Sequence, residues 1–107
     1  MNEECKVTID AGVCKMKTIV YAKVNPETRM VNINIESDCA SVLKMSLSIK
    51  PVCQYTEIES SITKTEIYKL ADEVHIHAAC PVPCAIIKAI EVAGGLGLKR
   101  NVTINIE

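Results

Sequence analysis

Cysteine is the residue type with the most distinctive chemistry in this chain of 107 residues, which contains six of them. Thiolates bind soft metal ions and attack electrophiles, whereas disulfides form in oxidising compartments. The start Met1-Asn2-Glu3-Glu4 has neither the basic residues nor the apolar stretch of a signal peptide. We therefore expect a cytoplasmic protein whose reduced thiols serve metal binding, thiol chemistry or packing.

Four of the six cysteines are candidate metal ligands: Cys14, Cys39, Cys80 and Cys84. Cys39 and Cys80 come just before predicted helices, whose first N–H groups and dipole stabilise a thiolate and lower its pKa. Cys84 follows Cys80 by about one helical turn. A set of four thiolates suits zinc or an iron–sulfur cluster.

The spacing of this set does not match a standard metal motif. Cys80-Pro81-Val82-Pro83-Cys84 is neither the C-x-x-C of thioredoxin nor the paired C-x2-C of a zinc ribbon. Simple packing is the alternative for all four thiols, because reduced cysteine is among the most buried residue types. Asp38 and His77 are substitute ligands if one thiol is absent.

The remaining polar candidates have structural explanations. We expect Cys5 and Cys53 to pack as small hydrophobic residues. His75 and His77 lie on one side of the chain if this segment is extended, where they form a polar edge or a metal-binding pair.

A polar stripe crosses the last predicted helix. Cys84, Lys88 and Glu91 are spaced at i, i+4 and i+7 on an otherwise apolar segment. An exposed, salt-bridged stripe is the simpler explanation. Placement of Lys88 against bound thiolates is the alternative, which burial of its charge makes unfavourable.

Alternation of apolar and polar residues predicts three consecutive strands, over Cys5–Asp10, Lys15–Val24 and Thr28–Glu36. In the third strand the isoleucines share one face and the asparagines the other. One face of the resulting sheet is therefore expected to be exposed to water.

Helices and one more strand are predicted in the rest of the chain. An apolar stripe predicts a helix over Cys39–Ile49, and a capping box at Thr63–Glu66 begins a second that stops near Asp72. One short helical turn is expected around Ile58 and Ile62. Pro81 and Pro83 open a third helix that continues through Ala85–Ala93, and Val102–Ile106 alternates as a last strand.

This order, β-β-β-α-α-α-β, predicts a single α+β domain over residues 1–107. Its expected form is two layers, with helices on one face of a mainly antiparallel, four-stranded sheet. If the first three strands alternate in direction, Cys14 and Cys39 emerge at the same end. Cys80 joins them if the last strand runs parallel to the first.

Composition excludes several classes of protein. Lys and Arg total 12 against 13 Asp and Glu, and the only aromatic residues are three tyrosines. The chain thus lacks the basic field and the stacking platforms of nucleic-acid binding proteins. No apolar stretch reaches the roughly 20 residues of a membrane helix. We expect no nucleic-acid or membrane partner; a protein partner or a homodimer is left open.

The cysteine segments resemble those of an uncharacterised family of small proteins from anaerobic archaea, prominently methanogens, and bacteria. The recognisable segments are Asp10–Cys14, Ser37–Cys39, His77–Pro83 and Ala85–Leu98. The family pattern carries three cysteines, which match Cys14, Cys39 and Cys80.

The sequence also departs from that pattern. The family often has Gly-Phe after the first cysteine and Pro after the second, where this chain has Lys15-Met16 and Ala40. A residue other than cysteine is usual at the position of Cys84. The resemblance therefore implies a site of three thiolates, whose open position Asp38, water or a small ligand could fill.

Three hypotheses follow for function. The first is a metal-binding protein holding an iron–sulfur cluster, with zinc as the second candidate; separate ligand segments and an anaerobic family favour the cluster. The second is a metal-free interaction or scaffold domain. The third is a thiol enzyme or sulfur carrier that uses Cys80 or Cys39 as its nucleophile.

Overall fold

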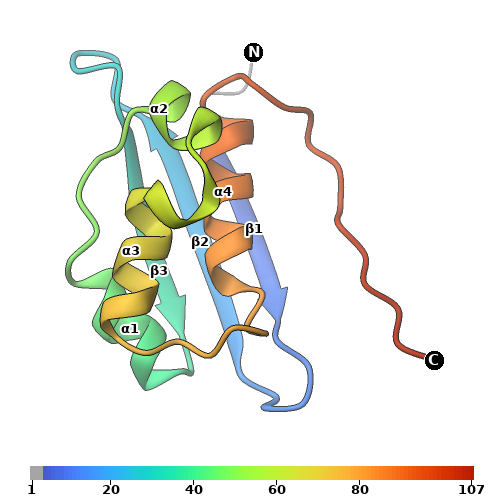
Figure 1. The fold of residues 1–107 in the computed structure, drawn as a ribbon. Coiled ribbons are helices and arrows are strands. Elements are labelled where there is room, and N and C mark those ends of the chain that lie inside the picture. Colours follow the sequence, from blue (N-terminus) through green and yellow to red (C-terminus); the bar gives the residue numbers. More distant parts are fainter. Residues whose placement is uncertain (1–3) are drawn as a thin grey trace.

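The computed structural model of the chain describes residues 4–107, so the expectation drawn from Met1 to Glu3 lies outside the described residues. Three strands, β1 (Glu4–Asp10), β2 (Lys17–Val24) and β3 (Val31–Ser37), form an antiparallel sheet in the order β1-β2-β3. All three predicted strands are present. Figure 1 shows this sheet as one layer of the fold.

Strand register separates a buried face of the sheet from an exposed one. Val20 on β2 lies opposite Val7 on β1 and Ile35 on β3, and all three point toward the helices. The neighbouring residues Tyr21 and Asn34 pair on the outer face and are exposed. The expectation that one face meets water is confirmed.

The second layer contains four α-helices and one 3-10 turn, all on one face of the sheet (Figure 1). Their bounds are α1 Ala40–Ser46, α2 Gln54–Glu59, η1 Ile62–Lys64, α3 Glu66–Glu73 and α4 Val82–Ala93. α4 packs across β1 and β2, while α1 packs beside β3, and α3 contacts both of these helices. The architecture is therefore α+β with two layers, as predicted.

A single hydrophobic core lies between the layers. Its largest fully buried side chains come from β2, β3 and every α-helix except α2: Val20, Val31, Val42, Met45, Ile67, Val82, Ile86 and Ile90. α4 is the most apolar helix, and its buried residues recur at the three- and four-residue spacing of a helical face.

The helical prediction needs two changes. The first helix ends at Ser46, three residues before Ile49, because the Ser46 Oγ donates to the Leu43 carbonyl at 2.6 Å and the chain turns there. The irregular region contains the six-residue α2 and the η1 turn, where one helical turn was expected. The helices predicted from the capping box at Thr63–Glu66 and from Pro81 are present, although the first is capped by Thr65 and not by Thr63.

The predicted last strand is wrong. Residues 99–107 form no regular element, and the alternating apolar side chains Val102, Ile104 and Ile106 are 63%, 75% and 94% exposed. Alternation gives this segment one apolar and one polar face. Within residues 4–107, however, its backbone N–H and C=O groups do not pair with any strand. The sheet has three strands and the order is β-β-β followed by helices.

Candidate functional site

Cys14, Cys39 and Cys80 lie at one end of the fold, which we call the thiol end. The β1–β2 turn, the end of β3 and the segment leading into α4 meet there, at the bottom of Figure 1. Because the strands are antiparallel, the end of β1 and the end of β3 share this edge. Cys80 arrives by the direction of α4, with no fourth strand involved.

Cys14 lies in an exposed turn between β1 and β2. The Lys15 N–H donates to the Gly12 carbonyl at 2.8 Å, and the Gly12 N–H donates to Asp10 Oδ1 at 3.1 Å. Gly12 has a φ of 89° and Lys15 one of 59°, so two left-handed residues shape the turn. The Cys14 side chain therefore faces solvent from a tight connection.

Cys39 occupies the N-cap position of α1 with extended backbone angles. Its N–H donates to Ser37 Oγ at 3.0 Å, and that hydroxyl is also hydrogen-bonded to Thr18 Oγ1 at 2.8 Å. Just before it, the Asp38 carboxylate accepts the Lys17 N–H at 3.1 Å. Cys39 is thus half-buried at a position fixed by bonds between β2 and β3.

Cys80 is half-buried against the core just before α4. Burial raises the pKa of its thiol, the Val82 N–H lowers it by less, and the negative charges of Cys39 and Cys14 raise it. The expected lowering of the Cys80 pKa is therefore wrong, because desolvation outweighs the helix terminus. The contributions of Cys39 and Cys14 to this pKa are those of nearby charges, separate from burial.

Cys84 is exposed in the first turn of α4, beside Tyr68 of α3. Burial raises the pKa of the Tyr68 hydroxyl, and the charges of Cys84 and Cys80 raise it further. Tyr68 thus lies close to both thiols.

A groove of about 570 Å³ runs beside this pair of thiols. Cys80 lines it together with Tyr68, Asp72, His77 and Pro83. Cys80 is therefore the candidate thiol that a bound small molecule would meet in a hollow.

The two histidines are not an extended pair. His75 has a φ of 60° and its N–H donates to the Asp72 carbonyl at 3.1 Å, so the chain turns there. Both imidazoles are exposed, and only His77 lines the groove. His77 therefore shares the groove with Cys80, whereas His75 does not line it.

The polar stripe on α4 is salt-bridged. Lys88 Nζ lies 2.9 Å from Glu91 Oε1, with the two side chains 44% and 26% exposed. The simpler explanation of the stripe is confirmed. An exposed pair of this kind adds about 0.5 kcal/mol or less to stability.

The candidate ligands are not assembled into a metal-binding group. Throughout residues 4–107, no three His, Cys, Asp or Glu side chains lie close enough together to hold a metal ion. All six thiols are free. The thiol end therefore has donor atoms of the kind that soft metals prefer, but its described side chains do not form a ready ligand set.

Cys53 is a thiol that sequence reasoning placed among the merely packed ones. It is the N-cap of α2, and hydrogen bonding from the Thr56 N–H and hydroxyl lowers the pKa of its thiol, with a smaller contribution from the Tyr55 N–H. The sequence pattern does not place Cys53 at a helix terminus, because it predicts only a short turn around Ile58 and Ile62 and not α2. Cys5, by contrast, has its pKa raised by burial and lowered in part by Lys99.

We expect Cys53 to react faster than Cys80 with iodoacetamide in the reduced, metal-free protein near neutral pH. The thiolate is the reactive form, and the Cys53 pKa is lowered while the Cys80 pKa is raised. The ratio of the two rates should shrink as the pH rises through both pKa values. Peptide mass spectrometry after timed quenching measures both rates; equal rates near neutral pH would contradict the assignment.

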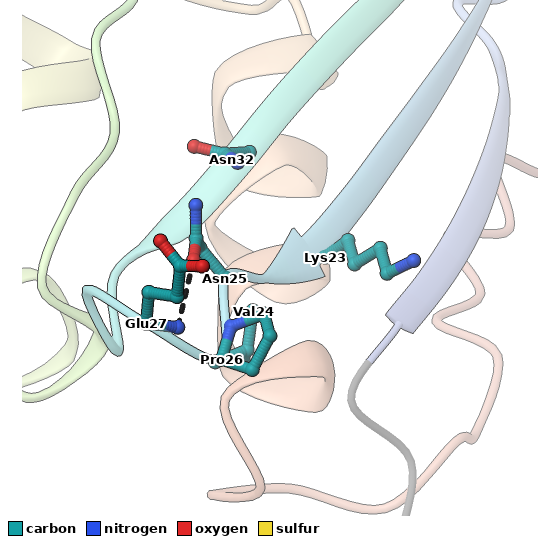
Figure 2. Close-up of a pocket in the computed structure, with 6 residues that line it drawn as sticks. All are labelled: Lys23, Val24, Asn25, Pro26, Glu27 and Asn32. Carbon is teal, nitrogen blue, oxygen red and sulfur yellow. Dashed lines mark hydrogen bonds between the residues drawn. The ribbon is translucent and has the colours of Figure 1, made fainter.

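A second hollow lies at the opposite end of the sheet and contains no cysteine. Figure 2 shows its lining residues: Lys23, Val24, Asn25, Pro26, Glu27 and Asn32. Asn25 Oδ1 accepts the Glu27 N–H at 2.8 Å, the bond drawn in the figure, and the Thr28 N–H at 3.3 Å. These bonds satisfy the backbone of the turn itself.

Fold and site together define a small two-layer α+β protein with three half-exposed or exposed thiols at one end. The chain belongs to a family of unknown function (DUF6951), whose model matches residues 5–106. No curated protein and no solved structure matches it. Among residues 4–107, none of the helices has the length and apolar character needed to cross a membrane.

Proposed function

We propose that the protein holds an iron–sulfur cluster through Cys14, Cys39 and Cys80, with zinc as the second candidate. The observation that carries the proposal is the arrangement of the strands and of α4, which brings Cys14, Cys39 and Cys80 from three separate segments to one end of the fold. The ligands lack the paired spacing typical of structural zinc sites, which favours the cluster.

Electrostatics supports a cation at this place. Neighbouring thiolates repel one another, and each disfavours ionisation of the next. A bound metal centre removes that repulsion and deprotonates the thiols, so metal affinity should rise with pH.

Metal binding requires the side chains at the thiol end to rearrange, because the described residues form no ready ligand set. Metal binding to incompletely formed sites is commonly coupled to local ordering of the chain. Cys84 is the first candidate for a fourth ligand, followed by His77 on the groove wall and Asp38 beside Cys39. With three thiolates alone, one coordination position stays open to water or a small ligand.

The thiol-enzyme hypothesis has less support. A nucleophilic thiol works as a thiolate, and burial raises the pKa of Cys80. Cys80 therefore contributes little thiolate at neutral pH unless a metal displaces its proton.

Substitution of one ligand tests the proposal. Purified and reconstituted without oxygen, the wild type should carry iron and acid-labile sulfide and absorb broadly in the visible range. Cys39→Ser should reduce the bound iron at least about tenfold, because loss of a ligating thiolate weakens the site by more than the 1.4 kcal/mol of one decade.

Cys53→Ser is the matched control, because it removes a thiol that lies at a different helix terminus. It should load as the wild type does. If the wild type instead binds stoichiometric zinc without sulfide, and Cys39→Ser loses that zinc, the bound metal is zinc and not an iron–sulfur cluster. Equal loading of both variants, or no iron or zinc in the wild type, would contradict the proposal.

A further inference from the structure

The C-terminal segment 98–107, which we call the arm, has the pattern of a strand but pairs with no strand among residues 4–107. Val102, Ile104 and Ile106 alternate with polar residues, and their exposure rises from 63% to 94% along the segment. Figure 1 shows the arm leaving the top of α4 and running extended beside the molecule. Alternating apolar and polar residues are typical of a strand that buries one face, but here the apolar side chains are exposed.

The β1 edge of the sheet is open and could receive such a strand. Within residues 4–107, β1 pairs only with β2, whereas β3 has a bridge from Val31 to Val52 at its outer side. Unpaired backbone groups on an edge strand are a template for another strand. β1 has seven residues, close to the length of the alternating part of the arm.

The buried face is incomplete at this same edge. Val20 and Ala22 on β2 are 0% and 1% exposed, but Cys5 and Val7, their partners on β1, are only half-buried. A strand beside β1 would place three branched apolar side chains next to these two. Burial of that area is the main source of stability for strand addition.

The arm does not fit the β1 edge of its own chain. α4 returns the chain to the end where β1 begins, so a strand continuing from it would run parallel to both β1 and β3. Figure 1 shows β3 and β1 on opposite sides of the sheet and the helices in front of it. A crossover from β3 through these helices to the far side of β1 would be left-handed, a hand that parallel connections almost never take.

A strand from another molecule is free of this constraint. Each copy offers one arm and one edge, so reciprocal exchange about a twofold axis satisfies both and closes the assembly. Gly94, Gly95 and Gly97 separate the arm from α4, and Gly95 has a φ of 80°. These glycines form a connection whose direction can change without disturbing the helix.

We propose that two copies of this chain form a dimer in which the arm of each adds as a strand to the β1 edge of the other. The inward side chains of the added strand are Val102, Ile104 and Ile106, which cover Cys5 and Val7. Thr103 and Asn105 then lie on the outer, solvated face. The partner is thus a second copy of this chain, and the proposal does not depend on the metal site.

The test is the mass of the full chain in solution, with chelator and reductant present so that neither metal nor disulfides can join two copies. Sedimentation equilibrium at about 100 μM should give a dimer, since a Kd of about 10 μM suffices for most chains to be paired at that concentration. Ile104→Lys should raise the dimer Kd at least about tenfold, because it puts a charge on the buried face of the added strand.

Thr103→Lys is the matched control, one residue away on the opposite face of the arm, and should leave the dimer Kd unchanged. Neither position contributes to the core of the single chain, so at a concentration well below the dimer Kd the circular dichroism of both variants should match that of the wild type. A monomeric full chain at this concentration would overturn the proposal. So would a dimer that Ile104→Lys and Thr103→Lys weaken equally.

Discussion

Glu57→Ala should lower the free energy of unfolding by about 2–4 kcal/mol, because it leaves a buried N–H group and a partly buried one without a charged acceptor. Glu57 on α2 is 3% exposed. Its Oε1 accepts the Glu66 N–H at 3.0 Å, and its Oε2 accepts the Ile67 N–H at 3.0 Å. One carboxylate thus caps α3 from a different helix.

Urea unfolding followed by circular dichroism measures the effect. Glu59→Ala, an exposed glutamate on the same helix, is the matched control and should change stability by about 0.5 kcal/mol or less. Glu57→Gln keeps one oxygen acceptor and should lie between the two. If Glu57→Ala and Glu59→Ala unfold at the same urea concentration, Glu57 does not hold α3.

Ile86→Ala should also destabilise the fold strongly, by about 2–5 kcal/mol. Ile86 is 0% exposed on the face of α4 that packs on β1 and β2. The substitution removes apolar surface and leaves a cavity at the centre of the layer contact. Because α4 also carries Cys84 and follows Cys80, loosening it should weaken metal loading as well.

Lys88→Ala, on the same helix but half-exposed, provides the comparison for Ile86→Ala. It breaks only the ion pair with Glu91 and should change stability by about 0.5 kcal/mol or less. Thermal unfolding of the two variants side by side gives the difference. A loss in Lys88→Ala as large as that in Ile86→Ala would show that α4 is not held mainly by its apolar face.

The parts of the fold that the sequence predicts are those with a regular apolar period. β1, β2 and β3 alternate cleanly, and α3 and α4 carry both an apolar face and an N-terminal signal, the Thr63–Glu66 pattern for one and Pro81 for the other. The cap of α3 differs from the predicted one: the pattern places it at Thr63, whereas Thr65 Oγ1 accepts the Tyr68 N–H at 3.1 Å. Local sequence and tertiary packing agree in these elements.

The failures have a common physical cause. The arm 98–107 alternates as a strand does. Alternation indicates that one face is apolar, but it does not indicate which strand, if any, the segment pairs with. α2 has few apolar residues of its own; it is held by packing on α4, where Gly94 lies close to Gln54, a contact that no local pattern predicts. Its glutamate caps α3 nine and ten residues further along the chain.

For the site, strand direction could be predicted and thiol environment could not. Antiparallel pairing of three consecutive strands is enough to bring Cys14 and Cys39 to one end. The ionisation of each thiol depends instead on how deeply it packs and on which N–H groups face it. Cys80 before the long α4 has a raised pKa, while Cys53 before the short α2 has a lowered one.

A protection measurement tests most directly whether one centre is bound by thiols from three segments. Protein loaded with iron and sulfide, or with zinc, is pulsed with N-ethylmaleimide, and peptide mass spectrometry then reads the modification at each cysteine. We predict that loading protects Cys14, Cys39 and Cys80 while Cys53 is modified as fast as in the metal-free protein. Protection of fewer than two of those three, or equal protection at Cys53, would contradict a shared centre at the thiol end.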